Sequence, residues 1–497
     1  MICAILSTLF LGIVVAVVVD YIISLFQLKK YPPGPFPLPL VGNLHWLGGP
    51  PTQLCDALRK KYGNVASLSI GRKRLVIVQG LNEARDALSA KGEAFAGRPN
   101  DNYAVDLITE DFNDIAFGAY GPRLKAMRKI AHGALKMYGE GLAKLEGSIL
   151  MEVEKLFERF DENKDEAFNP DVDLCLAVSN IICTILFGRR YEKDESELQD
   201  VLKFTSLTLR YDLTALVNFV PLLRLLPNKL LSNFKLGVAM KDRFFDKKLR
   251  EHMESFDQNN LRDFTDFVLH NFENERKADS KIQSYIHDVN LRQILSDLLL
   301  AGGETTSTVL RWSLLYLATL PEIQQKIAIE RRQKIGSRQP RLNDRRNLPY
   351  FEAVLMEILR MSTVTPLILR KTITDTQCDG QSIPAETVVW FFLPEINSDT
   401  KEWNEPDVFK PERFLDENGD MIHRKSKREM SFGLGRRSCL GEVLAKAELF
   451  IFLSNILYRY EIRMDKADFP GFDAVFCVVR VPKPYKIRLV KRSINED

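Results

Sequence analysis

The sequence lacks several features that would assign it to a common class of protein. Its seven cysteines are widely spaced and form no CxxC pair, which argues against a disulfide framework or a structural zinc site. The 69 basic residues are nearly balanced by 66 acidic ones, so bulk charge indicates no polyanionic partner. No nucleic-acid-binding signature and no Gly-rich dinucleotide or flavin fingerprint is present. We therefore expect reduced thiols and no nucleic-acid partner.

Internal repeats and low-complexity tracts are also missing, and no linker after residue 45 resembles a domain boundary. Helical periodicity dominates the chain, with clear examples at residues 142–160, 174–187, 293–320 and 351–361. Strand patterns are few: a hairpin at 65–70 and 74–78, and single strands at 388–393 and 485–490. The sequence predicts a mainly α-helical body with small peripheral β-sheets, in a single domain over residues 45–497.

The amino terminus is apolar. Residues 1–19 carry no charge, and the apolar run resumes after Asp20, which makes it long enough for a membrane-spanning helix. A cleaved signal peptide is the alternative, but its basic start, shorter apolar core and cleavage site are not evident. We predict a retained anchor over residues 1–28, with Asp20 near one end of the span, and a basic, proline-rich hinge over 29–44. Lys29 and Lys30 place the rest of the chain on the cytoplasmic side.

A second apolar stretch lies at residues 213–231, in what is otherwise a connecting region. It is too short and too interrupted by proline to span a bilayer. Core packing and contact with a membrane surface are both compatible with it.

The segment 432–441, FGLGRRSCLG, carries the most specific chemistry. Its glycines allow a tight fold and a close approach of the backbone to a flat ligand. Arg437 stands two residues before Cys439 and can pair with an anion. A helical pattern begins at Glu442, and a helix start and nearby positive charge favour a thiolate. We interpret Cys439 as an axial thiolate ligand to haem iron.

A second motif lies inside the long helical pattern. Gly302 and Gly303 each cost about 1 kcal/mol relative to alanine in a helix, so they require an explanation. A local opening of the helix beside Ala301 and Thr305 would provide one. Glu304 and Thr305 would then form an acid–hydroxyl pair suited to relaying protons. A buried helix with a tolerated kink is the alternative.

Glu357 and Arg360 lie three apart on one helical face among apolar neighbours. Such pairs usually decorate surfaces and contribute little. Here the apolar flanks, and Arg413 in the downstream segment 409–414, predict a buried ion-pair cluster. We expect that cluster to fix the chain beneath the cysteine loop, in a structural role.

Taken in order, these segments and the anchor-plus-proline start resemble the cytochrome P450 family, the haem-thiolate monooxygenases. The resemblance covers essentially the whole chain. The cysteine loop matches the family signature at Phe432, Gly435, Arg437, Cys439 and Gly441. The family implies a mostly helical fold that holds haem b between the long helix and the cysteine loop.

The resemblance also implies roles for individual residues. Cys439 is the iron ligand, with Phe432, Gly435 and Gly441 around the cofactor, and Thr305 and Glu304 are the oxygen-activation pair. The positions that bind haem propionates are Arg98, Arg128 and Arg437, and Lys371 could serve the same anion. The positions that line the substrate pocket are Ala301, Gly302, Val364, Thr365, Leu369 and Phe476.

The sequence departs from the family pattern in two places. Leu124 stands four residues before Arg128, where the family usually has tryptophan, so one propionate donor is lost. Phe392 and Asn397 precede Asp399 where the family often has asparagine and histidine, and we expect altered packing there without loss of activity.

Electrons must come from another protein. Two basic segments could dock an acidic NADPH-dependent flavoprotein reductase, although such charge runs are usually solvated surfaces. Their members are Arg123, Lys125, Arg128, Lys129, Arg424, Lys425, Lys427 and Arg428. With the anchor, this places the protein in the endoplasmic reticulum membrane with its catalytic domain facing the cytoplasm.

Within the family, the chain looks most like the animal microsomal group that includes steroid 17-alpha-hydroxylases and hydroxylases of planar aromatic xenobiotics. We expect insertion of one oxygen atom from O2 into a steroid- or sterol-like molecule or a planar aromatic one. The sequence does not choose between these substrates, nor does it give the site of attack or a second carbon–carbon cleavage. An oxygen-independent isomerase, against which Glu304 and Thr305 argue, and a non-catalytic haem sensor or carrier are the alternatives.

Overall fold

The computed structural model describes residues 2–49, 51–139, 142–164, 166–209, 211, 216–218, 221–278, 286–422, 430–476 and 478–492. Within these ranges the chain forms two compact units. Unit 1 comprises Met1–Pro99, Pro366–Val408 and Phe432–Ser438. Unit 2 comprises Asn100–Thr365, Phe409–Ser431 and Cys439–Asp497.

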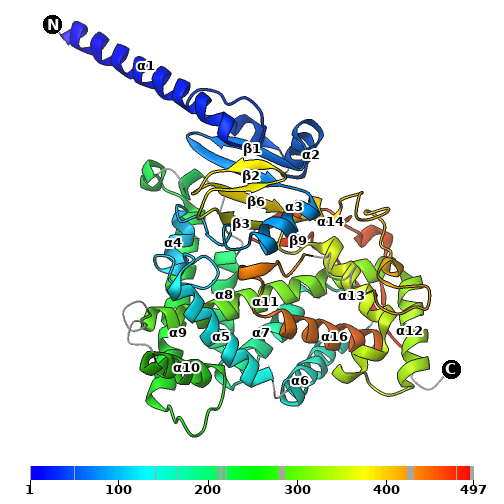
Figure 1. Ribbon diagram of the computed structural model, residues 1–497. Coiled ribbons are helices and arrows are strands. Elements are labelled where there is room, and N and C mark those ends of the chain that lie inside the picture. Colours follow the sequence, from blue (N-terminus) through cyan, green and yellow to red (C-terminus); the bar gives the residue numbers. More distant parts are fainter. Residues whose placement is uncertain are drawn as a thin grey trace. The chain divides into compact units, whose positions relative to one another are not determined.

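Unit 1 is built on a four-stranded sheet of order β1-β2-β6-β3 (Figure 1). The strands are β1 (Val65–Ile70), β2 (Lys73–Val78), β6 (Val388–Phe392) and β3 (Leu367–Lys371). β1 and β2 form an antiparallel hairpin, β6 runs parallel to β2, and β3 runs antiparallel to β6. A two-stranded sheet joins β4 (Thr376–Cys378) to β5 (Gln381–Ile383). The predicted hairpin and the predicted strand at 388–393 are thereby confirmed.

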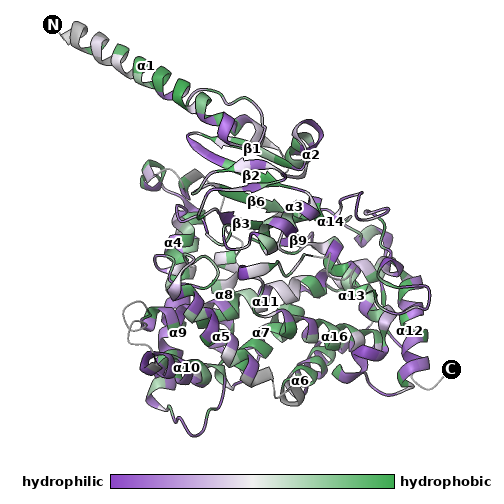
Figure 2. Ribbon diagram, in the orientation of Figure 1, coloured by the Kyte–Doolittle hydropathy of each residue, from purple (hydrophilic) through white to green (hydrophobic). Residues whose placement is uncertain are grey.

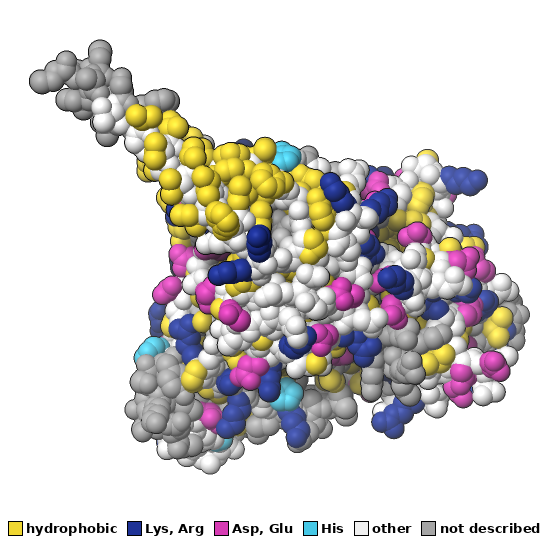
Figure 3. Space-filling view, turned by 45° about the horizontal axis from the view of Figure 1, so that its top comes forward, with side chains coloured by type: hydrophobic (Ala, Val, Ile, Leu, Met, Phe, Trp, Pro, Cys, Tyr) yellow, Lys and Arg dark blue, Asp and Glu magenta, His cyan; other side chains and the backbone are white. Residues whose placement is uncertain are grey.

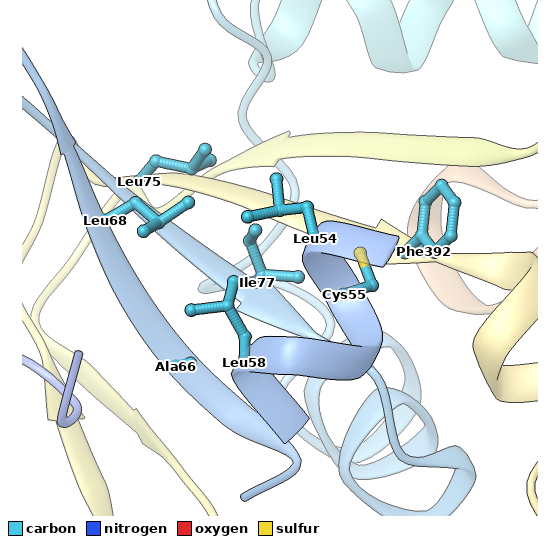
Figure 4. Close-up of a cluster of buried hydrophobic side chains, with 8 residues drawn as sticks. All are labelled: Leu54, Cys55, Leu58, Ala66, Leu68, Leu75, Ile77 and Phe392. Atoms are coloured by element: carbon cyan, nitrogen blue, oxygen red, sulfur yellow. The ribbon is translucent and has the colours of Figure 1, made fainter. Parts of the chain in front are cut away.

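One face of this sheet is covered by helix α2 (Pro51–Tyr62). Alternate residues of β1 and β2 point to the same side of the sheet and meet helix residues four apart, as the strand and helix periods require. The buried cluster consists of Leu54, Cys55, Leu58, Ala66, Leu68, Leu75, Ile77 and Phe392 (Figure 4). Phe392, one of the departures from the family pattern, thus belongs to a hydrophobic core. Burial raises the pKa of the Cys55 thiol, so that residue acts as an apolar packing group.

The remaining α-helices described in unit 1 are α1 (Ile2–Gln27), α3 (Leu81–Arg85) and α14 (Leu393–Asn397). The end of α1 is bonded to the sheet region: Tyr21 donates to the carbonyl of Pro37 at 2.9 Å, and Arg74 donates to the carbonyl of Ser24 at 2.7 Å. Hydrophobic residues run along α1 (Figure 2).

Among the helices in the part of the chain that the structure describes, none is both long enough and apolar enough to cross a membrane. Residue 1 and the side chains of residues 2–5, 7, 9, 10 and 13 lie outside the description. The anchor over residues 1–28 therefore stays a prediction, as do the predicted domain boundaries.

Unit 2 is mainly helical (Figure 1). Its α-helices are α4 (Tyr103–Thr109), α5 (Pro122–Gly139), α6 (Leu142–Asp161), α7 (Asp171–Phe187), α8 (Ser196–Leu209), α9 (Lys229–Glu254), α10 (Phe264–Ala278), α11 (Asp288–Thr319), α12 (Pro321–Ile335), α13 (Pro349–Ser362) and α16 (Glu442–Arg459). Its strands pair as β7 (Tyr460–Arg463) with β10 (Arg488–Lys491) and β8 (Ala474–Phe476) with β9 (Arg480–Pro482). The four predicted helical segments correspond to α6, α7, α11 and α13.

Helix α11 is the core of unit 2, and α7, α13 and α16 pack against it. Most of its 32 residues are buried, which is the pattern of a helix enclosed by protein. The helix continues without interruption through Gly302 and Gly303, so the predicted local opening is wrong. Gly302 has a different reason: a Cβ there would lie 2.9 Å from Cδ1 of Ile182 in α7, so glycine allows the two helices to approach closely.

The carboxyl-terminal strand is shorter than predicted. β10 begins at Arg488, whereas Ile487 forms an isolated bridge with Phe168 and Tyr485 donates its hydroxyl to the carbonyl of Arg311. Residues 485–487 therefore make two long-range contacts instead of extending the hydrogen-bonded strand.

The apolar stretch 213–231 is described only at residues 216–218 and 221–231. Val217 and Leu231 are buried in a hydrophobic cluster with Phe234. Four leucines of the same stretch are exposed: Leu222, Leu225, Leu226 and Leu230. Core packing therefore explains part of the stretch and leaves an exposed apolar part.

Candidate active site

The first half of the cysteine loop lies in unit 1 and depends on glycine. Gly433 and Gly435 have φ of +66° and +71°, values that favour glycine. A Cβ at Gly435 would lie 1.9 Å from the carbonyl oxygen of Leu88, so no other residue fits. A short 3-10 helix, η9 (Gly435–Arg437), follows at once.

Three of the predicted propionate ligands lie in unit 1. The buried Arg437 donates from Nε to the carbonyl of Ala96 at 2.9 Å. Arg98 donates from Nη1 to the carbonyl of Leu369 on β3, and the backbone N–H of Lys371 donates to Gly97 at 2.9 Å. The structure therefore gathers the segment 96–98, strand β3 and the loop around Arg437.

Lys371 has an acidic partner. Its Nζ lies 2.8 Å from Oε2 of the exposed Glu386. A propionate would have to compete with that carboxylate, so the role of Lys371 stays a prediction.

Cys439 opens the second half of the loop, in unit 2, three residues before α16 begins. Among the cysteines whose side chains are described (55, 175, 183, 378 and 439), it is the exposed one. Although the residue is exposed, the protein around it desolvates the thiol and raises its pKa, against which the backbone N–H of Gly441 and the charge of Arg128 act. An accessible sulfur that receives a backbone N–H suits a metal ligand, because a bound cation supplies the positive charge that stabilises a thiolate.

Arg128 of α5 and Cys439 influence each other electrostatically. Burial lowers the pKa of Arg128, and negative charge on the Cys439 sulfur acts in the opposite direction. Leu124, one turn earlier, is buried and offers no hydrogen-bond donor. Two predicted cofactor residues of unit 2 are thus coupled electrostatically.

The predicted acid–hydroxyl pair lies on α11, but its two members do not bond to each other. The Thr305 hydroxyl donates to the carbonyl of Ala301 at 2.6 Å. Oε1 of Glu304 lies 2.9 Å from Nη2 of Arg311, seven residues further along the helix. Sequence reasoning missed Arg311, although its spacing from Glu304 places both on one helical face.

The predicted structural cluster has the expected partners. Glu357 Oε2 and Oε1 accept from Arg360 Nε at 2.8 Å and Nη2 at 2.9 Å, and Oε1 also accepts from Arg413 Nε at 3.0 Å. The backbone N–H of Lys410 donates to the same carboxylate at 2.9 Å. All three charged side chains are buried. Glu357 therefore holds the segment 410–413 against α13.

Two predicted pocket residues are joined by a residue that sequence reasoning missed. The backbone N–H of Arg480 donates to Val364 at 2.8 Å, and Arg480 pairs with Phe476 across β8 and β9. Its guanidinium donates to the carbonyls of Met361 and Ser362 at 2.8 and 2.7 Å, which closes the end of α13. The side chain of Phe476 lies outside the described residues, Thr365 is half-buried, and Ala301 on α11 is exposed.

Of the two predicted docking segments, one is described. Arg123 donates to Asn113 and to the carbonyl of Phe112, and Lys129 pairs with Glu275 at 2.7 Å. Arg424, Lys425, Lys427 and Arg428 lie outside the described residues.

A helical body, a glycine-shaped loop and an accessible cysteine at the start of α16 are the features of a haem-thiolate protein. The cytochrome P450 family model matches residues 32–489. The chain belongs to the cytochrome P450 family: it is a monooxygenase of this family, and haem is its cofactor.

Individual relatives agree with that assignment. The chain is 38% identical to steroid 17-alpha-hydroxylase/17,20 lyase of Ictalurus punctatus, over 92% of this chain and 90% of that protein. It is 33% identical to cytochrome P450 1A1 of Opsanus tau, over 97% and 96% of the two chains. A solved structure, zebra fish cytochrome P450 with progesterone, is 30% identical with a TM-score of 0.79 and covers 89% of this chain and 100% of its own. These matches confirm the predicted mainly helical cytochrome P450 fold with small β-sheets.

Proposed function

We propose that this monooxygenase is membrane-anchored and inserts one oxygen atom from O2 into a lipophilic steroid-like or planar aromatic molecule, with electrons from NADPH through a flavoprotein reductase. The observation that carries the chemistry is Cys439, an accessible sulfur that receives the Gly441 N–H and interacts electrostatically with Arg128. Haem, when bound, supplies the activation and transfer of oxygen.

The side chains around the cofactor have defined tasks in this proposal. Cys439 binds iron as a thiolate, and the Gly441 N–H and the Arg128 charge stabilise the negative sulfur. Arg128, Arg98, Arg437 and Lys371 hold the propionates. Phe432, Gly435 and Gly441 shape the loop. Thr305 and Glu304 deliver protons from α11, with the Thr305 hydroxyl as the group that presents a proton and Glu304 as the acid that resupplies it through water, because the two side chains do not bond to each other.

The nature of the substrate follows from the pocket residues and the relatives. The proposed pocket positions include Ala301, Gly302, Val364 and Leu369, which are small or aliphatic and suit a flat apolar molecule. The matched relative from Ictalurus punctatus is named for steroid hydroxylation, and the matched structure has progesterone in its title. The similar identity to cytochrome P450 1A1 keeps planar aromatics as the second class.

Membrane attachment is supported by exposed apolar residues of unit 1. Figure 3 shows hydrophobic side chains gathered on α1 and the segment beside it. These include Val14, Val15, Val18, Val19, Ile22, Ile23, Phe26, Phe36, Leu38, Leu40 and Val41. Lys29 and Lys30 directly after α1 suit the cytoplasmic side of a membrane. We therefore assign the protein to the endoplasmic reticulum membrane, with α1 as its anchor.

The decisive experiment uses the haem-loaded protein. Wild type should give the red-shifted band of the reduced carbon-monoxide complex, and Cys439→Ser should abolish it. Titration with a panel of steroids and planar aromatics should shift the ferric spin state for one class. Wild type reconstituted with NADPH and the reductase should convert that class to a hydroxylated product. A retained band in Cys439→Ser would overturn the ligand assignment, and binding without NADPH-dependent product would favour a haem sensor or carrier.

A further inference from the structure

Arg311, a buried arginine, ties Glu304 to the rest of unit 2. Glu304, Thr308 and Arg311 are spaced by four and three residues, so they share one face of α11. Nη2 of Arg311 lies 2.9 Å from Oε1 of Glu304 and donates to the Thr308 hydroxyl at 2.7 Å. The carboxylate of Glu304 is therefore held by Arg311, which lies two turns further along the same helix.

The guanidinium is itself held from the opposite side. Nη1 of Arg311 lies 2.6 Å from Oδ1 of Asp171, the first residue of α7. Burial raises the pKa of Cys175, one turn after Asp171, to about 12, so this neighbouring thiol stays uncharged at neutral pH. Arg311 thus lies between two carboxylates that come from two different helices.

Arginine suits this position because its planar fork can bind two acceptors at fixed angles, whereas lysine offers a single point charge. Burial of the fork is costly unless both ends are paired, so the network has one favoured arrangement. In that arrangement Glu304 points along α11 towards Arg311, and the hydroxyl of Thr305 bonds to Ala301. In this arrangement the Glu304 carboxylate is bonded to Arg311 and not to Thr305.

We propose that Arg311 is a positioning residue that fixes the orientation of the Glu304 carboxylate for proton delivery. The inference rests on the proposed function, in which Glu304 supplies protons. When the acid is misoriented, the two electrons from NADPH and two protons leave on O2 as hydrogen peroxide, and less product and water form. A misplacement of this kind lowers a reaction rate by about tenfold or more.

The test compares Arg311→Gln, Glu304→Gln and the double variant in the haem-loaded, reductase-coupled protein. Arg190→Gln is the matched control, because Arg190 also pairs with a buried carboxylate, Glu152, through Nε at 2.5 Å. Arg311→Gln should raise the hydrogen peroxide formed per NADPH by about threefold or more and increase the solvent deuterium isotope effect on product formation. The control variant should lose thermal stability, while its hydrogen peroxide per NADPH and its solvent isotope effect stay at the wild-type values.

Arg311→Lys separates positioning from a merely structural role, and thermal unfolding tests whether the two side chains interact at all. Arg311→Lys should restore part of the coupling, since an ammonium can reach one carboxylate but not both. In thermal unfolding of the resting protein, the losses of stability in Arg311→Gln and Glu304→Gln should not add up in the double variant. This result would detect the interaction between the two side chains without any turnover.

The possible outcomes are distinguishable. If Arg311→Gln behaves like the Arg190 control, or if the two unfolding losses add, Arg311 does not position Glu304, while the proposed function stands. If Glu304→Gln leaves coupling unchanged, the acid assigned under the proposed function is wrong and the inference fails with it. A raised peroxide ratio in both single variants, with no further rise in the double variant, supports the proposal.

Discussion

Arg413 donates its Nε–H to Oε1 of Glu357 at 3.0 Å, across 56 positions of the chain. The same carboxylate accepts two hydrogen bonds from Arg360, so one anion neutralises two buried guanidiniums. Removing the anion leaves two positive charges in the protein interior, which is far costlier than losing a surface pair.

We therefore expect Glu357→Gln to lower the free energy of unfolding by about 3–5 kcal/mol, measured by denaturant titration of the haem-loaded protein. Glu352→Gln is the control, because the Arg345–Glu352 pair is more exposed and should cost about 0–1 kcal/mol. Equal losses in the two variants would show that the buried cluster is not a special source of stability.

Gly435→Ala should disrupt the cysteine loop. Its φ of +71° disfavours a side chain by about 1–2 kcal/mol, and the added Cβ would collide with the Leu88 carbonyl at 1.9 Å. Gly380→Ala is the control, because Gly380 also has a positive φ of +69° but open space around the Cβ position, so no collision is added there. We expect loss of bound haem, measured by absorbance per polypeptide, in Gly435→Ala only. Equal haem content in both variants would refute the steric argument.

Glu448 gives a pH dependence with a defined sign. It is buried on α16, and neither of its side-chain oxygens has a hydrogen-bond partner among the described residues. Burial raises the pKa of its carboxyl from 4.5 to about 8, which the nearby Thr306 hydroxyl only partly offsets. The folded state thus binds this proton more tightly than the unfolded state, so stability falls as pH rises from about 4.5 to about 8.

Glu448→Gln should remove that slope, because the amide does not ionise. The melting temperature of the variant should exceed that of wild type at pH 8, and the difference should shrink towards pH 5. Glu322→Gln, on the exposed side of α12, is the control. Its melting temperature should change with pH in the same way as that of wild type. A constant difference between Glu448→Gln and wild type across this range would contradict the prediction.

His252 gives a slope at higher pH. Its Nδ1 lies 2.8 Å from the Lys248 carbonyl and its Nε2 lies 2.9 Å from Oδ2 of Asp263, so both ring nitrogens face acceptors and the imidazolium is favoured. Burial alone would lower the pKa of His252, but the hydrogen bond and charge of Asp263, the Lys248 carbonyl and Asp266 raise it above 6.5. The stabilisation is fully present below pH 6.5 and is lost as pH rises through the higher pKa of the folded state.

His252→Gln should therefore lower the melting temperature more at pH 6 than at pH 9. His252, Asp263 and Asp266 also lie within 4.8 Å of one another, but the ring nitrogens are engaged and Arg262 binds Asp266. We accordingly expect added Zn²⁺ to leave the melting temperature of wild type unchanged. Zinc-dependent stabilisation that disappears in His252→Gln would show that the cluster is a metal site.

The sequence by itself determined the elements that depend on local spacing. Helical periodicity predicted α6, α7, α11 and α13, and the turn at Gly71 predicted the β1–β2 hairpin, because these patterns repeat within a few residues. The glycines and Cys439 of the cysteine loop, the acid at 304 and the Glu357–Arg360 pair were likewise identified from short motifs.

The tertiary structure alone decided which distant groups meet. Arg311 reaches Asp171 across 140 positions of the chain, and Arg480 closes the end of α13 across more than 100 positions. The close approach of Ile182 explains Gly302, where a local opening of the helix had been predicted. No local spacing encodes such contacts, since they arise when separate helices pack and buried polar groups must find partners. For the same reason the cysteine could be predicted from its motif, whereas the orientation of the acid on α11 could not.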